Sequence, residues 1–183
     1  HKACERLLQG KEISLLEEFP KRSAKKMLTG FINWFAKYQP RRLVINKTPL
    51  NPELVVASRH GYAGTADFVC SIENEPWVID WKTSKGVYLS HKIQITGYQN
   101  AIEEMYGIKP KRGILHLNPL TKEGYSFITD EKMTIEKTPI TIDDFILVLK
   151  TYIMLNGGTF PEPELIDRYP ETLRLEKLPD YEI

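Results

Sequence analysis

Two aspartates and a lysine are the residues of this sequence whose types and spacing are best suited to chemistry. Asp67 and Asp80 each stand near the end of a short apolar run, and Lys82 follows Asp80 by two residues. Because a carboxylate buried without a partner is costly, two of them on neighbouring strand ends predict a bound cation. Oxygen ligands of this kind suit Mg²⁺ or Mn²⁺ better than zinc. Side chains alternate along a strand, so Lys82 is expected to face the same way as Asp80.

These groups together are suited to the hydrolysis of a phosphodiester bond. A divalent ion can activate water, neutralise the transition state and help the leaving oxygen depart. A lysine with an ordinary pKa of about 10.4 stays protonated at neutral pH. We therefore expect Lys82 to orient the attacking water and to stabilise charge, whereas a depressed pKa would allow it to act as a base.

The spacing of Asp80 and Lys82 alone is not decisive. A chain of this length should contain roughly one or two D-x-K or E-x-K triplets by chance. Asp130 and Lys132 form such a triplet, but no partner carboxylate precedes them, and we assign them to a turn. A surface salt bridge on a strand is the alternative interpretation of Asp80 and Lys82.

Hydrophobic spacing predicts the elements that position these residues. Three- and four-residue steps predict helices over 1–9, from Ser23 as the N-cap to Tyr38, after Ser90 to 105, and over 141–155. Short apolar runs predict strands at 43–45, 54–57, 63–70, 77–81, 113–117 and 125–129. The strands between 43 and 82 are expected to form one meander that carries both aspartates. Residues 156–183 are expected to form an irregular tail, in which Leu173 and Leu175 could add an edge strand.

Composition limits the classes of protein to which the chain can belong. A length of 183 residues, with 42% hydrophobic and 27% charged residues, fits one globular α/β domain over 1–183. No apolar run is long enough to cross a membrane. Cys4 and Cys70 are the only cysteines, which argues against a zinc knuckle, an iron–sulfur cluster or a disulfide scaffold and favours a reducing cytoplasm. The chain begins at His1 without a methionine, which leaves missing upstream residues and a targeting segment open.

The charge is unevenly distributed, although its sum is only +1. The first 60 residues carry 12 Lys or Arg and 5 acidic residues. Two clusters there could follow the phosphates of a nucleic acid, and a solvated helix face is an equally good explanation for either. The clusters are Lys21, Arg22, Lys25 and Lys26, and Arg41 with Arg42. Trp34, Phe35 and Tyr38 could stack on unpaired bases, but core packing is the favoured interpretation. Trp81, which points away from Asp80 and Lys82, is expected in the core.

Three motifs occur in order around the two aspartates. They are Gly64-Thr65-Ala66-Asp67, then Val78-Ile79-Asp80-Trp81-Lys82-Thr83, then Gln94 with Tyr98 four residues later. They resemble the PD-(D/E)XK nuclease superfamily and, within it, the RecB-like and phage exonuclease branch, whose pattern is G-x-x-D, a D-x-K-T strand and a helix with Q-x-x-x-Y. The match is close over 53 to about 106. The expected α-β-β-β-α-β order extends it, which implies a restriction-endonuclease-like core with a central mixed β-sheet flanked by helices.

The resemblance implies particular metal ligands. Asp67 and Asp80 would bind the metal, with the backbone carbonyl of Trp81 as a third ligand, and Lys82 would be catalytic. Glu53 could be the acidic residue that many relatives place near the metal, and a solvent-facing residue at a strand edge is the alternative.

Further positions of the resemblance concern two helices. Gln94 and Tyr98 would flank the active centre from one helix face, with core packing as the alternative for Tyr98. His1 and Glu5 resemble the H-x-x-x-E helix of the same branch, in which the histidine ligates the metal and would favour manganese. A tag remnant or a frayed end is the alternative for His1, and a surface charge for Glu5. Ala66 replaces the proline that names the first motif, at a position that is loose in this branch.

The activity implied by the resemblance is that of a Mg²⁺- or Mn²⁺-dependent deoxyribonuclease in DNA recombination, repair or phage DNA processing. An exonuclease is preferred, and an endonuclease stays open as the alternative. Its partners would be single- or double-stranded DNA, a helicase or recombination protein, and further copies of the chain, in the cytoplasm of a bacterial or phage-infected cell. Thr83, Ser84 and Lys85 are expected to contact phosphate. A non-catalytic nucleic-acid-binding module of the same fold is the alternative, and RNA stays open as a substrate. The absence of a G-x-x-x-x-G-K-[ST] run argues against an NTPase.

Overall fold

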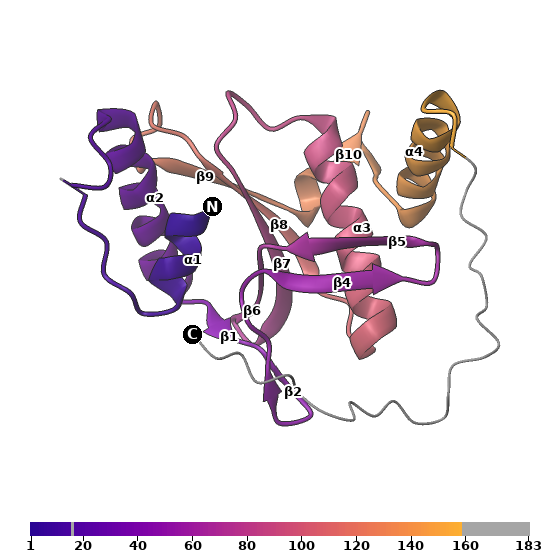
Figure 1. The fold of residues 1–183 in the computed structure, drawn as a ribbon, viewed down its shortest axis with the longest axis horizontal. Helices are drawn as coiled ribbons and strands as arrows, with labels where there is room; N and C mark the ends of the chain where they lie inside the picture. The colour runs from indigo at the N-terminus through magenta and orange to yellow at the C-terminus, as the bar shows by residue number, and fades with distance from the viewer. Residues whose placement is uncertain (16, 159–183) are drawn as a thin grey trace, which may run out of the picture.

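The computed structural model describes residues 1–15 and 17–158, which form a mixed sheet with helices on both faces (Figure 1). Within the sheet, β7 (Glu75–Lys82) and β8 (Lys111–Leu117) are parallel and the other neighbouring strands are antiparallel. The strand order is β1 (Arg41–Arg42), β6 (Phe68–Ile72), β7, β8 and β9 (Tyr125–Thr129). The prediction of an α/β fold with a central mixed sheet flanked by helices is confirmed, and the arrangement is consistent with a restriction-endonuclease-like core.

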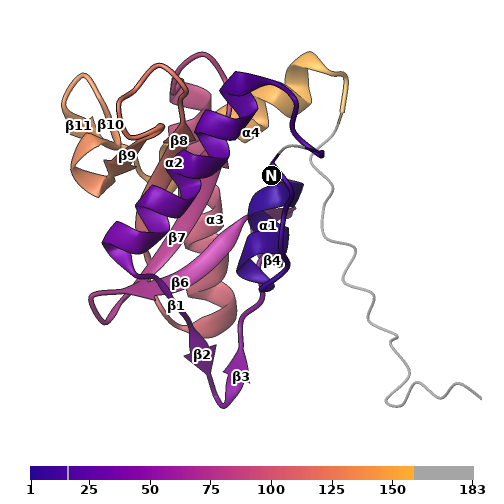
Figure 2. The ribbon, with the colours of Figure 1, turned by 90° about the vertical axis from the view of Figure 1, so that its left-hand side faces the viewer.

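Helices cover both faces of this sheet. They are α1 (Lys2–Leu8), α2 (Arg22–Tyr38), α3 (Leu89–Tyr106) and α4 (Ile142–Leu155). Figure 2 shows α1 and α2 in front of the sheet, with α3 behind it. Helix α3 is the crossover that joins the parallel strands β7 and β8. It ends as predicted at Gly107, which takes a left-handed conformation with a φ of 67° that glycine adopts without steric cost.

Strand β7 divides its side chains between two hydrophobic layers. Ile79 and Trp81 belong to the layer under α1 and α2, whereas Val78 belongs to the layer under α3. Trp81 is fully buried, so the prediction that it lies in the core is confirmed. Because side chains alternate along a strand, Asp80 and Lys82 face the α3 side.

The predicted strand 63–70 is wrong, because the chain forms two strands there. They are β5 (Tyr62–Ala66) and β6, and they separate at Asp67. The prediction of one meander is also wrong, since β5 pairs with β4 (Leu54–Ser58) in a hairpin outside the five-stranded sheet. The break has a physical cause. The pairing of β6 with β7 ends at Phe68 and Ile79, and the backbone N–H of Trp81 in β7 then donates to the side chain of Asp67 and not to a backbone carbonyl.

Smaller differences concern helix ends and hairpins. Helix α2 begins at Arg22, with Lys21 and not Ser23 at the N-cap, a shift within the usual uncertainty of helix ends. Two short hairpins complete the strands. They are β2 (Val44–Ile45) with β3 (Thr48–Pro49), and β10 (Thr134–Ile135) with β11 (Thr138–Pro139). The triplet at 130–132 forms a short 3-10 helix, η1 (Asp130–Lys132), so its assignment to a turn is confirmed.

Helix α4 is the last element of the described chain, and its bounds agree with the predicted helix over 141–155 to within one residue. None of the helices in the described ranges is long and apolar enough to cross a membrane. The predicted tail lies largely outside the described residues, as does the possible edge strand at Leu173 and Leu175.

Candidate active site

Asp67 lies at the bend between β5 and β6, and its carboxylate bridges the chain to β7. Its Oδ2 accepts a hydrogen bond of 2.8 Å from the backbone N–H of Trp81. Asp67 is only 6% exposed. The N–H and C=O of one residue in an extended strand face the same neighbour. The carbonyl of Trp81 therefore faces the side of β7 on which Asp67 lies.

Asp80 and Lys82 meet on the α3 side of β7. The Nζ of Lys82 lies 2.7 Å from Oδ2 of Asp80 and forms an ion pair with it. This ion pair is the contact that the buried Oδ2 makes with the rest of the described chain. Lys82 also donates a hydrogen bond of 2.9 Å to Oε1 of Gln94. The side chain of Asp80 is thus paired by charge with Lys82.

Helix α3 continues this chain of contacts. Nε2 of Gln94 donates a hydrogen bond of 2.9 Å to the hydroxyl of Tyr98, one helical turn further on. Burial raises the pKa of Tyr98, and the charge of Asp80 raises it further. The structure therefore brings Gln94 and Tyr98 to the same place as Asp80 and Lys82, where the motif placed them, and their functional roles stay predictions.

Gly64 allows the β4–β5 hairpin to lie directly on Tyr98. A Cβ added at Gly64 would stand 2.8 Å from Cε1 of the Tyr98 ring, closer than real Cβ contacts allow. The motif contained Gly64, but sequence analysis assigned it no role. A glycine inside a strand is a general signal for a close approach of another group, and this signal could have identified it.

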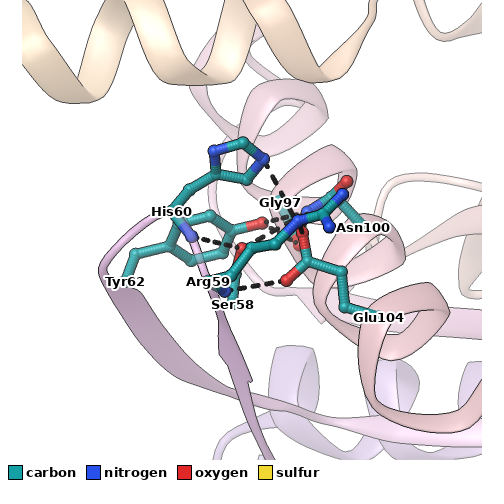
Figure 3. Close-up of polar contacts among 7 residues, drawn as sticks. All are labelled: Ser58, Arg59, His60, Tyr62, Gly97, Asn100 and Glu104. Carbon is teal, nitrogen blue, oxygen red and sulfur yellow. Dashed lines mark hydrogen bonds and ion pairs between the residues drawn. The ribbon is translucent and has the colours of Figure 1, made fainter. Parts of the chain in front are cut away.

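The far end of the same hairpin is tied to α3 by a polar network (Figure 3). Glu104 accepts a hydrogen bond of 2.8 Å from the backbone N–H of Arg59 and one of 2.9 Å from Asn100. Asn100 also donates to the hydroxyl of Tyr62, which itself donates to the carbonyl of Gly97 at 2.9 Å. Helix α3 thus holds the hairpin at its turn and at its middle, which fixes the base of the hairpin relative to β7.

The two carboxyl groups lack the positive charge that their burial requires. Burial raises the pKa of Asp67 to about 6, although the hydrogen bond from Trp81 and the charge of Lys82 lower it in part. Burial also raises the pKa of Asp80 to about 6; Lys82 opposes this rise and Asp67 adds to it. Opposite charge within a few ångströms favours the ionised form of a carboxyl group. A bound cation would therefore relieve a cost that Lys82 alone does not offset.

Glu53 and His1 lie beside Asp67. The backbone N–H of Glu53 donates a hydrogen bond of 2.9 Å to the carbonyl of Asp67. Burial raises the pKa of Glu53, and the charges of Asp67 and Glu5 raise it further, which places these three acids near one another. Glu53 precedes β4 by one residue, where sequence analysis expected the start of a strand. Nδ1 of His1 lies 3.4 Å from Oδ1 of Asp67, with its side chain half-exposed.

The donors present are compatible with a hard divalent cation. Over residues 1–15 and 17–158, no three His, Cys, Asp or Glu side chains are arranged to hold a metal. The carboxylates of Asp80 and Asp67 and the carbonyl of Trp81 nevertheless offer oxygen atoms around one end of β7. Mg²⁺ is commonly held by one or two carboxylates, with water and substrate phosphate as the remaining ligands. Two carboxylates therefore suffice for such a site.

The loop after β7 carries the residues expected to contact phosphate. Thr83 and Lys85 are exposed, as that role requires. The hydroxyl of Ser84 donates to the carbonyl of Gly86 at 2.7 Å, so it is used within the loop. The carbonyl of Ser84 accepts a hydrogen bond of 2.8 Å from Nε2 of His116, a residue of β8 that sequence analysis did not single out.

The aromatic and basic candidates of the first third lie elsewhere. Trp34 is fully buried and Tyr38 packs against the same core, which confirms core packing for both, whereas Phe35 is 37% exposed. The basic residues at the start of α2 and on β1 are exposed at least in part, and their contact with nucleic acid stays a prediction. They are Lys21, Arg22, Lys25, Lys26, Arg41 and Arg42.

No protein-family model matches this chain, and no curated protein matches its sequence. Among solved structures, one described as the crystal structure of SSO0001 is similar, with a TM-score of 0.34 and 18% sequence identity. The similarity covers 74% of this chain and 61% of that chain. It is too weak to indicate a function.

Proposed function

We propose that this chain is a metal-dependent nuclease that hydrolyses phosphodiester bonds of DNA. The observation that supports the proposal is the continuous set of contacts from Asp80 through Lys82 and Gln94 to Tyr98, beside the buried Asp67. Three sequence motifs on three different elements supply these residues. A surface salt bridge, the alternative for Asp80 and Lys82, does not account for two buried carboxyl groups with raised pKa values. Exonuclease activity is preferred on the strength of the resemblance alone.

Asp67, Asp80 and the Trp81 carbonyl would hold the metal ion, with His1 and Glu53 as further candidates on the same side. When bound, Mg²⁺ or Mn²⁺ supplies a Lewis acid that lowers the pKa of water and offsets the charge that develops on phosphate. The oxygen of water would attack phosphorus and lose a proton to solvent, while the bond from phosphorus to the leaving sugar oxygen breaks and that oxygen takes up a proton from solvent.

Lys82 is suited to orienting the attacking water and to stabilising charge. Its contact with Asp80 holds the ammonium group at the carboxylate end of the site. A fixed donor aimed at developing negative charge is a major source of catalysis.

Gln94 and Tyr98 are positioning residues in this scheme. Because the amide nitrogen of Gln94 donates to Tyr98, the amide oxygen is the atom that faces Lys82. The close packing of Tyr98 on Gly64 in turn limits where that hydroxyl can lie. Lys82 therefore has a partner on α3 that holds its ammonium group whether or not Asp80 binds a metal.

The test uses purified wild type and two variants, Asp80→Asn and Lys82→Ala, with end-labelled single- and double-stranded DNA in Mg²⁺, Mn²⁺ or EDTA. Lys132→Ala is the matched control, because Lys132 belongs to a triplet with the same spacing outside the site. Wild type and Lys132→Ala are expected to cut DNA only with a metal, and the two site variants are expected to be inactive while still binding DNA.

Two results would contradict parts of the proposal. A Lys82→Ala protein that cuts at the wild-type rate would remove the role of Lys82. Absence of cutting with either metal, with DNA still bound, would favour the non-catalytic nucleic-acid-binding module. Circular DNA and a labelled RNA in the same assay separate exonuclease from endonuclease activity and DNA from RNA as the substrate.

A further inference from the structure

His91 stands in the first turn of α3, on the face that carries Gln94 and Tyr98. These residues are three and seven positions apart along the helix, so their side chains share one face. Gln94 contacts Lys82 from this face. The imidazole of His91 therefore belongs to the wall of the candidate active site, at the end where the loop after β7 leaves the sheet.

A hydrogen bond fixes which nitrogen of His91 carries the proton. The backbone N–H of Tyr88 donates to Nδ1 of His91 at 3.3 Å, and the Tyr88 ring packs edge-on against the imidazole at 5.3 Å. An acceptor at Nδ1 requires that the neutral ring bears its hydrogen on Nε2. Within the described parts of the chain, Nε2 makes no hydrogen bond, so this donor is free to bind another molecule.

The surroundings of His91 are electropositive. Burial lowers the pKa of His91, and the charges of Lys82 and His116 lower it further. The lowered pKa favours the neutral imidazole of His91. A neutral N–H donor beside a lysine suits an anionic oxygen, and it adds no further positive charge to a place that must also accept a cation.

Two histidines hold the loop 83–88 between them. His116 donates to the carbonyl of Ser84 near one end, and Nδ1 of His91 accepts from Tyr88 at the other. The exposed Lys85 lies on this loop. The donor on His91 is thus placed at the rim of the loop that continues directly from the catalytic strand.

We propose that His91 is a phosphate-binding residue of the candidate active site, whose Nε2–H donates to a non-bridging oxygen of a nucleic-acid phosphate next to Lys82. The inference rests on the proposed function and names a contact that the sequence motifs do not include. A second interpretation is that His91 acts only through Nδ1, as a support for the loop.

Two conservative variants separate these interpretations. The side-chain amide of glutamine places a donor near the position of Nε2, so His91→Gln keeps the proposed phosphate contact, and glutamine at this position of the helix can also accept from the backbone N–H of Tyr88. Asparagine places an acceptor near the position of Nδ1, so His91→Asn keeps the support of the loop and loses the distal donor. His60→Ala is the matched control, because His60 lies half-exposed at the turn of the β4–β5 hairpin.

The measurement is the affinity for an end-labelled oligonucleotide in EDTA, followed by KM and kcat with Mn²⁺, for full-length variants whose unfolding midpoints match that of the wild type. We expect His91→Asn to weaken the affinity for DNA and to raise KM, each on the order of 10- to 100-fold, as for the loss of a hydrogen bond to a charged oxygen. His91→Gln and His60→Ala are expected to stay within about threefold of the wild type.

A His91→Asn protein that binds DNA like the wild type would overturn the proposal and assign His91 to the support of the loop. Equal behaviour of both variants and the wild type would overturn it as well. A wild type that binds DNA without cutting it contradicts the nuclease, but the affinities in EDTA still test His91. A wild type that neither binds nor cuts DNA removes both proposals.

Discussion

Replacement of Asp80 by asparagine is expected to stabilise the folded protein in the absence of metal, although it removes a charged residue from an ion pair. Asp80 is 3% exposed, and burial raises its pKa from 3.8 to about 6 despite the nearby Lys82. The attraction of Lys82 is already included in that pKa. Asparagine resembles the neutral form of the carboxyl group in size and shape, so the variant avoids the cost of ionising Asp80 inside the fold.

The magnitude follows from the difference between the two pKa values. A rise of about two pKa units corresponds to roughly 3 kcal/mol at about 1.36 kcal/mol per unit. Because the folded-state pKa lies above the unfolded value, the folded state binds this proton more tightly. The stability that the proton contributes is fully present below pH about 4 and is lost as the pH rises through about 6. Ionised Asp80 therefore costs about 3 kcal/mol at pH 8 and less than about 1 kcal/mol at pH 4.

The assay is urea unfolding of wild type and Asp80→Asn in EDTA at pH 4 and pH 8. The variant should be more stable by up to about 3 kcal/mol at pH 8, with little difference at pH 4. Asp130→Asn is the control, because the Asp130 carboxylate accepts hydrogen bonds of 2.6 and 2.9 Å from Arg112. It should lower stability by roughly 1–3 kcal/mol at pH 8. An Asp80→Asn protein that is no more stable than the wild type at pH 8, or equally stabilised at both pH values, would refute the reasoning.

Three further expectations concern the metal, the packing of the hairpin and a buried arginine. Mn²⁺ should raise the unfolding midpoint of the wild type but not that of Asp80→Asn. The rise should be larger at pH 8 than at pH 5, because a carboxyl group with a pKa of about 6 must ionise to bind the metal. Equal midpoint shifts in both proteins would contradict the metal site. Gly64→Ala should reduce the rate of DNA cleavage about tenfold or more, because the added Cβ displaces Tyr98 and displacements of about 1 Å at active sites have effects of this size. Gly86→Ala is the control and should match the wild type, because a Cβ at Gly86 meets open space. Arg112→Met should lower the free energy of unfolding by roughly 1–3 kcal/mol, measured in urea, because Asp130 loses the hydrogen bond from Nε and the carbonyl of Ile140 loses its partner; a loss below about 1 kcal/mol would show that these contacts contribute little.

Local periodicity was sufficient to predict the parts of the site that lie on one element. The alternation of a strand places Asp80 and Lys82 opposite the core residue Trp81, and the structure agrees. The helical repeat places Gln94 and Tyr98 on one face, where they are hydrogen-bonded to each other. These relations depend only on backbone geometry within a few residues, which the sequence expresses directly.

Contacts between elements could not be predicted in the same way. The break at Asp67 depends on the N–H of Trp81, 14 residues further along, because the carboxylate accepts it where the strand ladder ends. The separate β4–β5 hairpin depends on a register that no local pattern specifies. The free Nε2 of His91 depends on how the loop after β7 returns to α3.

The sequence alone therefore determined the α/β class, the faces of β7 and α3, and the carboxylate pair with its lysine. The tertiary structure decided which groups touch: that Gly64 admits Tyr98, that the side chain of Asp67 accepts a hydrogen bond from Trp81, and that Lys82 pairs with Asp80 and Gln94. The physical reason is that periodicity sets the direction of a side chain along its own element. The distance to its partner is set by strand register and loop closure, which many residues far apart in the sequence determine together.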